Sequence, residues 1–278
     1  MNSIGSLGVG VQSTAMYYMS LLGILPKLDF FIFSDTGGEK TKTLEYWEFL
    51  INWQKENNGS PLYKANYKNL EKDLLNQSNS SGNRFASIPA FTMNEGKGML
   101  RRQCTGEYKI AQLNKKYREI LDIGNKHFPQ TEIWIGISFD ERGRMSVPQE
   151  KWKINVYPFC GYKIYSDGHN ERISKYIKTR SEIIYWLKEN KFPIPEKSSC
   201  KFCPFQSDYD WKRLKDNSPD DFEIACTVDE KIRNCSKRGI KSPLYLHRSL
   251  MPLREVQFYE KQKGFFDDLG NCTDYCDV

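Results

Sequence analysis

Apolar segments that read as strands alternate with helix-like segments through the first half of the chain. Residues 1–5 form a short apolar lead, residues 28–34 an apolar run rich in β-forming side chains, and residues 131–137 an alternating aromatic run. Residues 15–22 and 43–53 have the length and apolar spacing of helices. Weaker patterns predict a strand at residues 62–67, a helix at 70–75 and a helix that ends near Leu121. This alternation indicates an α/β domain.

Residues 6–14 read Ser-Leu-Gly-Val-Gly-Val-Gln-Ser-Thr and join the first apolar segment to the first predicted helix. Glycines in such a turn let the backbone approach an anion, and the free N–H groups of the first helical turn point at it. Ser13 and Thr14 add hydroxyl donors. A phosphate group suits this turn. The alternative is an ordinary tight strand-to-helix turn, because glycine-rich loops also occur by chance.

Charged residues follow two further predicted strands at the point where each strand ends. Asp35 comes directly after the run 28–34, and Asp140 and Glu141 follow residues 131–137. Ligands of open α/β sheets bind at the carboxyl ends of the strands. Together with the glycine-rich loop, these residues predict one nucleotide-binding crevice.

Residues 101–109 gather two arginines, a lysine and the thiol of Cys104. This composition suits polyphosphate binding beside a metal or redox site, and a solvated basic face is the alternative.

Composition sets bounds on location and partners. The 278 residues include 41 basic and 35 acidic side chains, a net charge of +6, which permits an anionic partner without requiring one. The sequence has neither an apolar run long enough for a membrane span nor a secretion leader, so we expect a cytoplasmic protein with no membrane partner. In that compartment, eight cysteines favour metal ligands, catalytic thiols or core residues over disulfides.

A second chemical centre is the motif Cys200-Lys-Phe-Cys203-Pro. Two thiolates at this spacing can bind one metal ion or one edge of a cluster, although a complete site needs more ligands. Cys272 and Cys276 lie in an acidic tail, where their spacing allows a metal, a disulfide or a mobile thiol pair.

Several motifs in this order resemble one protein family. They are the glycine-rich loop that ends in Gln-Ser-Thr, Asp-Thr-Gly-x-Glu at residues 35–39, Arg-x-Cys-Thr-x-x-Tyr-Lys-Ile at 102–110, Gly-Ile-Ser-x-Asp-Glu at 136–141, the cysteine motif at 198–205 and Leu-His-Arg-Ser-Leu-Met-Pro-Leu at 246–253. Together they cover most of the chain and resemble the phosphoadenosine phosphosulfate (PAPS) reductase-like family of the N-type ATP pyrophosphatases, in the adenine nucleotide alpha hydrolase or PP-loop superfamily.

The resemblance implies a fold and an organisation. It implies a doubly wound, mostly parallel α/β domain over residues 1–155 that binds ATP or a sulfated adenosine nucleotide (APS or PAPS). It also implies a mainly helical C-terminal module over residues 156–278 that carries the cysteines and packs on the crevice. A homodimer is compatible with this layout.

The resemblance also implies roles for individual residues. The residues that would hold the phosphates are Ser6, Gly8, Gly10, Ser13 and Thr14. The ribose or phosphates would lie beside Asp35, Thr36 and Gly37, and Arg101 and Arg102 would neutralise phosphate charge. The residues that would close the crevice are Ser138, Asp140 and Glu141. Of these, Ser13, Asp35, Arg101 and Asp140 are the expected catalytic residues. Gln12 stands where the usual loop carries an acidic residue, so Mg²⁺ would depend on Asp35, Asp140 or the nucleotide.

Many members of this family carry an iron–sulfur cluster. The resemblance makes Cys104 a third ligand beside Cys200 and Cys203, but Ile183 occupies the position of the expected fourth cysteine. Cys160 could replace it, which would give a four-cysteine [4Fe–4S] site. The alternatives are a cluster with three thiolates and one open iron, a Zn²⁺ site, or no metal.

The leading expectation is an ATP-dependent enzyme that adenylates an acceptor for sulfur transfer. The sulfur would come from a cysteine persulfide or the cluster, with a cysteine desulfurase as a candidate donor and tRNA or DNA as candidate acceptors. One alternative is a sulfonucleotide reductase, in which Cys272 or Cys276 would attack the sulfate. Another is a non-catalytic nucleotide-binding protein with a structural zinc.

Overall fold

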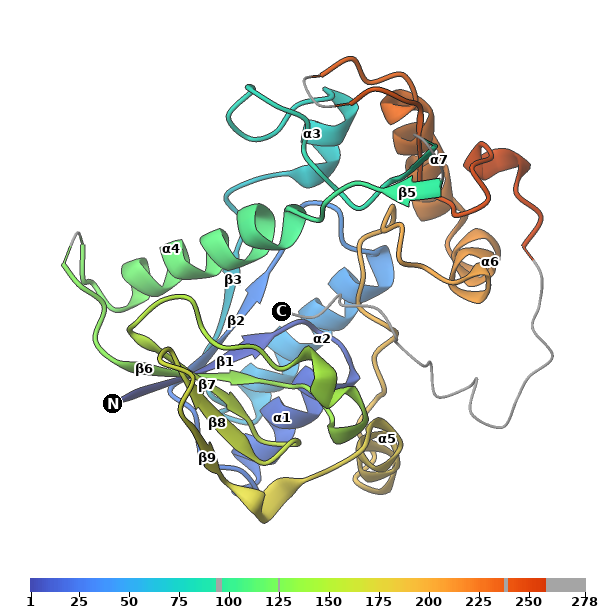
Figure 1. Cartoon of the computed structure of the whole chain (residues 1–278). Coiled ribbons are helices and arrows are strands. Elements are labelled where there is room, and N and C mark those ends of the chain that lie inside the picture. The colour runs from blue at the N-terminus through green and yellow to red at the C-terminus, as the bar shows by residue number, and fades with distance from the viewer. Residues whose placement is uncertain (94–96, 125, 238–239, 259–278) are drawn as a thin grey trace.

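The computed structural model describes residues 1–93, 97–124, 126–237 and 240–258 (Figure 1). Its main feature is a seven-stranded sheet in the order β3-β2-β1-β6-β7-β8-β9. Five neighbouring strands are parallel: β3 (Leu62–Ala65), β2 (Phe30–Ser34), β1 (Asn2–Leu7), β6 (Thr131–Ile135) and β7 (Lys153–Tyr157). Two antiparallel strands extend one side: β8 (Tyr162–Tyr165) and β9 (Asn170–Arg172). The expected α/β class with a mostly parallel sheet is confirmed.

Helices cover both faces of this sheet. On one face, α1 (Val11–Leu21) and α2 (Thr41–Glu56) share a core with Phe31 and Phe33 of β2. On the other face, α4 (Ala111–Ile120) packs against Phe30 and Ile32. All five residues of β2 are therefore buried, which explains its continuous apolar sequence.

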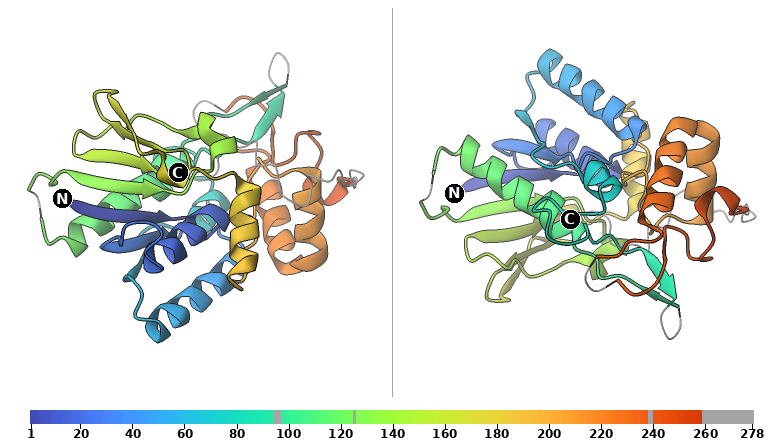
Figure 2. Two further views of the ribbon diagram at one scale, coloured as in Figure 1. Left: turned by 90° about the horizontal axis from the view of Figure 1, so that it is seen from below. Right: turned by 90° about the horizontal axis from the view of Figure 1, so that it is seen from above.

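A second core lies beside the sheet and joins distant parts of the chain. It combines residues between Leu70 and Tyr108 with residues between Phe202 and Leu253. The elements around it are α3 (Leu70–Leu75), α6 (Asp208–Asn217), α7 (Pro219–Ile232) and a three-stranded antiparallel sheet of β10 (Leu244–Tyr245), β4 (Phe91–Met93) and β5 (Lys97–Met99). Helices α6 and α7 lie at the end of the main sheet away from the N-terminus (Figure 2). The expected boundary near residue 155 falls inside β7, so the main sheet continues past it.

The remaining elements are α5 (Arg180–Glu189), a π-helical turn (Thr105–Ile110) that leads into α4, and 3₁₀ turns at Phe139–Arg144, Ser174–Tyr176 and Leu253–Glu255. Within the described ranges, no helix is long and apolar enough to cross a membrane.

The strand order creates a switch point beside β1. The chain runs from β1 to β2 and β3 on one side and returns through β6 and β7 on the other. The connections that leave β1 and β6 therefore diverge, which opens a crevice at the carboxyl ends of the strands, where ligands of such sheets bind.

Candidate functional site

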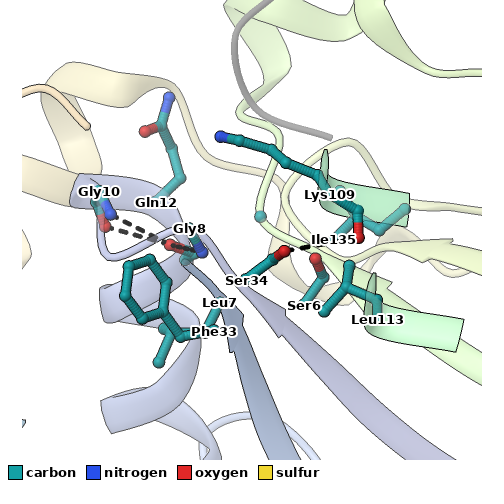
Figure 3. Close-up of a pocket in the computed structure, with 12 residues that line it drawn as sticks. Ser6, Leu7, Gly8, Gly10, Gln12, Phe33, Ser34, Lys109, Leu113 and Ile135 are labelled. Atoms are coloured by element: carbon teal, nitrogen blue, oxygen red, sulfur yellow. Dashed lines mark hydrogen bonds between the residues drawn. The ribbon is translucent and has the colours of Figure 1, made fainter. Parts of the chain in front are cut away.

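A pocket occupies the switch point at the carboxyl ends of β1, β2 and β6 (Figure 3). It is lined by Ser6, Leu7, Gly8, Gly10, Gln12, Ser13, Phe33, Ser34, Lys109, Leu113, Ile135 and Gly136. The cavity volume is about 40 Å³. Because one water-sized probe needs roughly 10–15 Å³, this space suits one small oxyanion, and the rest of a nucleotide would lie over the mouth.

The glycine-rich loop is held in shape by Ser13. The Ser13 Oγ atom accepts hydrogen bonds from the backbone N–H groups of Gly8 at 3.1 Å and Gly10 at 3.3 Å, and it donates to the Gly10 carbonyl at 3.3 Å. Between the glycines, Val9 adopts the left-handed backbone region with φ of 55°. Ser13 therefore accepts from amides that would otherwise face an anion at the helix N-terminus.

The end of β6 presses directly against this helix N-terminus. A Cβ atom on Gly136 would lie 2.7 Å from the backbone nitrogen of Ser13, so only glycine fits there. The neighbouring Thr14 hydroxyl is buried and has no hydrogen-bond partner among the described residues. The loop is thus enclosed on one side by β6.

Asp35 and its neighbours form a second loop beside the pocket. Asp35 is buried, forms an ion pair with Lys64 at 2.9 Å and accepts a hydrogen bond from the backbone N–H of Gly37 at 2.8 Å. Thr36 donates to Glu39 at 3.0 Å. Asp35 therefore shapes this loop, while the preceding Ser34 lines the pocket.

Gln12 connects the glycine-rich loop to the segment that follows β6. Its Nε2 atom donates to Glu141 at 3.0 Å and lies 3.5 Å from Ser138 Oγ, while its Oε1 atom accepts from Arg180 at 2.8 Å. Asp140 accepts from the backbone N–H of Arg180 at 2.9 Å. The structure thus brings Ser138 and Glu141 to Gln12, with Asp140 beside them, and adds Arg180, a residue not expected at this position.

The basic residue at the pocket is Lys109 and not either of the arginines expected there. Arg101 is exposed, and the guanidinium of Arg102 lies 5.8 Å from the ring centroid of Phe205, beside the cysteine motif. Lys109 lines the pocket, and its side chain extends to the same side of the loop as that of Gln12 (Figure 3). The π-helical turn places Lys109 there. The Tyr-Lys-Ile motif, which contains Lys109, is the feature of the sequence that indicates a role for this lysine.

The cysteine motif packs against both loops of the crevice. Ser198 Oγ donates to the Gly8 carbonyl at 2.5 Å, and Cys200 pairs with Glu39 in an antiparallel bridge. The Cys200 Sγ atom lies 3.4 Å from the Thr36 hydroxyl oxygen. Burial, with a smaller effect from the Glu39 carboxylate, raises the pKa of the Cys200 thiol, so this residue is a neutral thiol at physiological pH.

Cys104 and Cys200 both pack against the second core. Cys203 follows Cys200 in a tight turn, with its N–H donating to the Cys200 carbonyl at 3.1 Å. Cys203 is thereby held beside Cys200, and Cys104 shares the second core with Cys200.

Cys160 lies elsewhere. Its Sγ atom donates to the carbonyls of Ile137 at 3.3 Å and Ser138 at 3.4 Å, and only 1% of the residue is exposed. Burial raises the pKa of this thiol to about 12. Ile183 packs in the core shared with α1. Both positions considered for a fourth ligand therefore point into hydrophobic cores.

The structure does not assemble the expected four-cysteine site. Among the residues it describes, no three Cys, His, Asp or Glu side chains form a group that could hold a metal ion. Cys226 and Cys235 are buried in the second core, and Cys272 and Cys276 lie outside the described residues.

Comparison with known proteins gives no match: no family model, no curated protein and no solved structure is significantly similar to this chain.

Proposed function

We propose that the pocket binds the phosphates of an adenine nucleotide and that the protein is an ATP pyrophosphatase-type enzyme with the doubly wound fold of the PAPS reductase-like family. Three features support this proposal: the pocket lies at the switch point of the sheet, the N-terminus of α1 faces it, and Lys109 lines it.

One observation carries the link to sulfur chemistry. The segment that bears Cys200 is hydrogen-bonded to the glycine-rich loop through Ser198 and Gly8, at 2.5 Å. The Cys200 thiol itself lies 3.4 Å from Thr36 in the neighbouring loop. A thiol group is thereby fixed to the glycine-rich loop that lines the pocket and to the loop beside it.

The proposed reaction begins with attack of an acceptor oxygen on the α-phosphorus of ATP. Pyrophosphate leaves, and the α1 amides with the Lys109 ammonium stabilise the negative charge that develops on the phosphates. The terminal sulfur of a cysteine persulfide then attacks the adenylated carbon, and AMP leaves with the oxygen. A second cysteine thiolate breaks the S–S bond, so the sulfur stays on the carbon and the two cysteines end as a disulfide. The net charge of +6 suits a tRNA or DNA acceptor.

Neither expected metal group fits the side chains as they are arranged. The two carboxylates considered for Mg²⁺ are both engaged: Asp35 by Lys64 and Asp140 by the Arg180 N–H. For a four-thiolate cluster, Cys160 donates to two backbone carbonyls in a separate core. No step of the proposed reaction is therefore assigned to either group.

The second candidate function is a sulfonucleotide reductase. The engaged carboxylates favour it in the case of APS, because APS carries fewer negative charges than ATP and therefore depends less on a divalent cation. Two assays distinguish the candidates: release of pyrophosphate from ATP, and thiol-dependent release of sulfite from APS or PAPS.

Nucleotide binding is tested by Lys109→Met, with Lys115→Met as the matched control. Lys115 is an exposed lysine on the following helix, where its ammonium lies 3.9 Å from the Tyr67 ring centroid. Loss of a charged contact to phosphate is expected to raise the Kd for ATP, measured by calorimetry, by about tenfold or more in Lys109→Met. The control is expected to keep the parent Kd. Equal affinity in both variants, or no binding of ATP, APS or PAPS to the parent, would refute the proposed function.

A further inference from the structure

The side-chain amide of Gln12 is a neutral bridge between a cation and an anion. Its oxygen accepts from the Arg180 guanidinium at 2.8 Å, and its nitrogen donates to the Glu141 carboxylate at 3.0 Å. These two partners fix the orientation of the amide, because a guanidinium only donates and a carboxylate only accepts. Gln12 lies in the first turn of α1, directly beside the phosphate pocket.

A carboxylate at position 12 could not make this bridge. It has no proton to donate to Glu141, and two carboxylates at hydrogen-bond distance repel each other. A divalent cation at the same position would in turn lie beside the guanidinium of Arg180. The local charges therefore suit an amide at position 12 and disfavour a metal ion there.

Arg180 is held in position from two directions. Its backbone N–H donates to Asp140 at 2.9 Å, and it occupies the first position of α5 after the N-cap Thr179. Thr179 and Glu182 form a reciprocal capping box that fixes this helix start, with the Thr179 N–H donating to Glu182 at 2.6 Å. A rigid helix end thus presents the guanidinium to the glycine-rich loop.

We propose that Arg180, acting through Gln12, replaces a loop-bound divalent cation: it holds the first turn of α1 over the phosphate site, supplies positive charge at the mouth, and makes nucleotide binding independent of a metal ion on the protein. Arg180 is a positioning residue in this scheme. The inference rests on the proposed function, because it concerns the same phosphate pocket.

The test measures the Kd for ATP by calorimetry in excess MgCl₂ and in excess EDTA. The parent is compared with Arg180→Gln, Arg180→Lys, Gln12→Glu and the double variant Gln12→Ala/Arg180→Gln, and circular dichroism confirms that each is folded. Arg142→Gln is the matched control, because Arg142 is an exposed arginine of the same mouth segment that contacts the Phe139 ring. Mg²⁺ also binds ATP itself, and this effect is the same for every variant. The ratio of the Kd in EDTA to the Kd in MgCl₂ is therefore compared between the parent and Gln12→Glu.

The expected Kd of the parent changes by less than about threefold between the two buffers. Arg180→Gln should weaken binding about tenfold in both, Arg180→Lys should regain part of the loss, and the double variant should bind no worse than Arg180→Gln. Gln12→Glu should bind weakly in EDTA and recover with Mg²⁺. A parent that binds ATP only with Mg²⁺, or an Arg180→Gln variant with parental affinity, overturns the inference and leaves the proposed function standing. A parent that binds no ATP in either buffer overturns both.

Discussion

Ser13 and Thr14 are adjacent residues with side-chain hydroxyl groups, but only the Ser13 hydroxyl forms hydrogen bonds among the described residues. Ser13 Oγ accepts from two loop amides, whereas the Thr14 hydroxyl has no partner among the residues described. A buried hydroxyl without a partner adds no hydrogen bond to the ligand-free fold, while one that accepts from two amides stabilises the loop. The resemblance treats the two residues alike, but their surroundings differ.

Replacing Ser13 with Ala should lower the free energy of unfolding of the ligand-free protein by about 1–3 kcal/mol, because the amides of Gly8 and Gly10 lose their acceptor. Thr14→Val, which keeps the shape, should change it by less than about 0.5 kcal/mol. Urea denaturation measures both. Equal destabilisation in the two variants would show that the hydrogen bonds of Ser13 do not support the loop.

Cys160 makes stability depend on pH in the alkaline range. Burial raises the pKa of its thiol from 9.0 to about 12, so the folded protein retains a proton that the unfolded chain releases. The contribution is complete below about pH 9 and is lost as the pH rises toward about 12. When the pH rises from about 8 to about 10.5, the free energy of unfolding should fall in both proteins. The fall should be about 2 kcal/mol smaller in Cys160→Ala than in the parent. Val156→Ala, a truncation in the core that α1 and α2 share with β2, should keep the parental pH dependence and thereby control for the cavity.

At the scale of elements, helix α2 receives its cap from a distant helix. Its own N-cap residue, Lys40, makes no side-chain capping bond. Instead, the carboxylate of Asp221 in α7 accepts from the Thr41 N–H at 2.7 Å and the Thr41 hydroxyl at 2.8 Å. Asp221 also forms an ion pair with Lys201 at 3.6 Å. This contact joins the helix after the Asp35 loop to the C-terminal part of the chain.

Asp221→Ala should therefore destabilise the protein by about 2 kcal/mol, in the upper range for the loss of a helix cap, because the residue is only 2% exposed. The adjacent Asp220 is exposed, and Asp220→Ala should stay within about 0.5 kcal/mol of the parent. Thermal and urea denaturation compare the two. A parental stability for Asp221→Ala would mean that water replaces the carboxylate at the start of α2.

For the whole molecule, sequence patterns predicted the positions of helices and strands better than they predicted contacts between distant residues. The apolar run 28–34 and the segment 70–75 correspond to β2 and α3, because local periodicity reflects which faces are buried. The Gln12–Arg180 contact spans 168 residues, and no local pattern reports such a pairing. Whether Cys160 turns toward the cysteine motif or into a core depends on how β7 packs, which is a tertiary property. The substitution at Ile183 was visible in the sequence, but its burial against α1 was not.

The second core implies that the N-terminal two thirds of the chain do not fold alone. A chain that ends at residue 195 lacks Phe202, Trp211 and Leu246, which share the second core with Leu70 and Leu74. We expect this truncated chain to show weak near-ultraviolet circular dichroism and no cooperative thermal transition, because a large apolar surface stays exposed. A sharp unfolding transition in the truncated chain would show that the main sheet is an independent domain.

The hydrogen bond between Ser198 and Gly8 also determines when this part of the structure can form during synthesis. It spans 190 residues, so the ribosome makes the glycine-rich loop long before the serine that holds it. At roughly 5–20 residues per second, the interval is about 10 to 40 s. Throughout that interval the nascent chain carries the glycine-rich loop without the cysteine-bearing segment that packs on it. The two sides of the candidate site are therefore completed in the same late step of synthesis, and a chain released early would not have the candidate site in its final form.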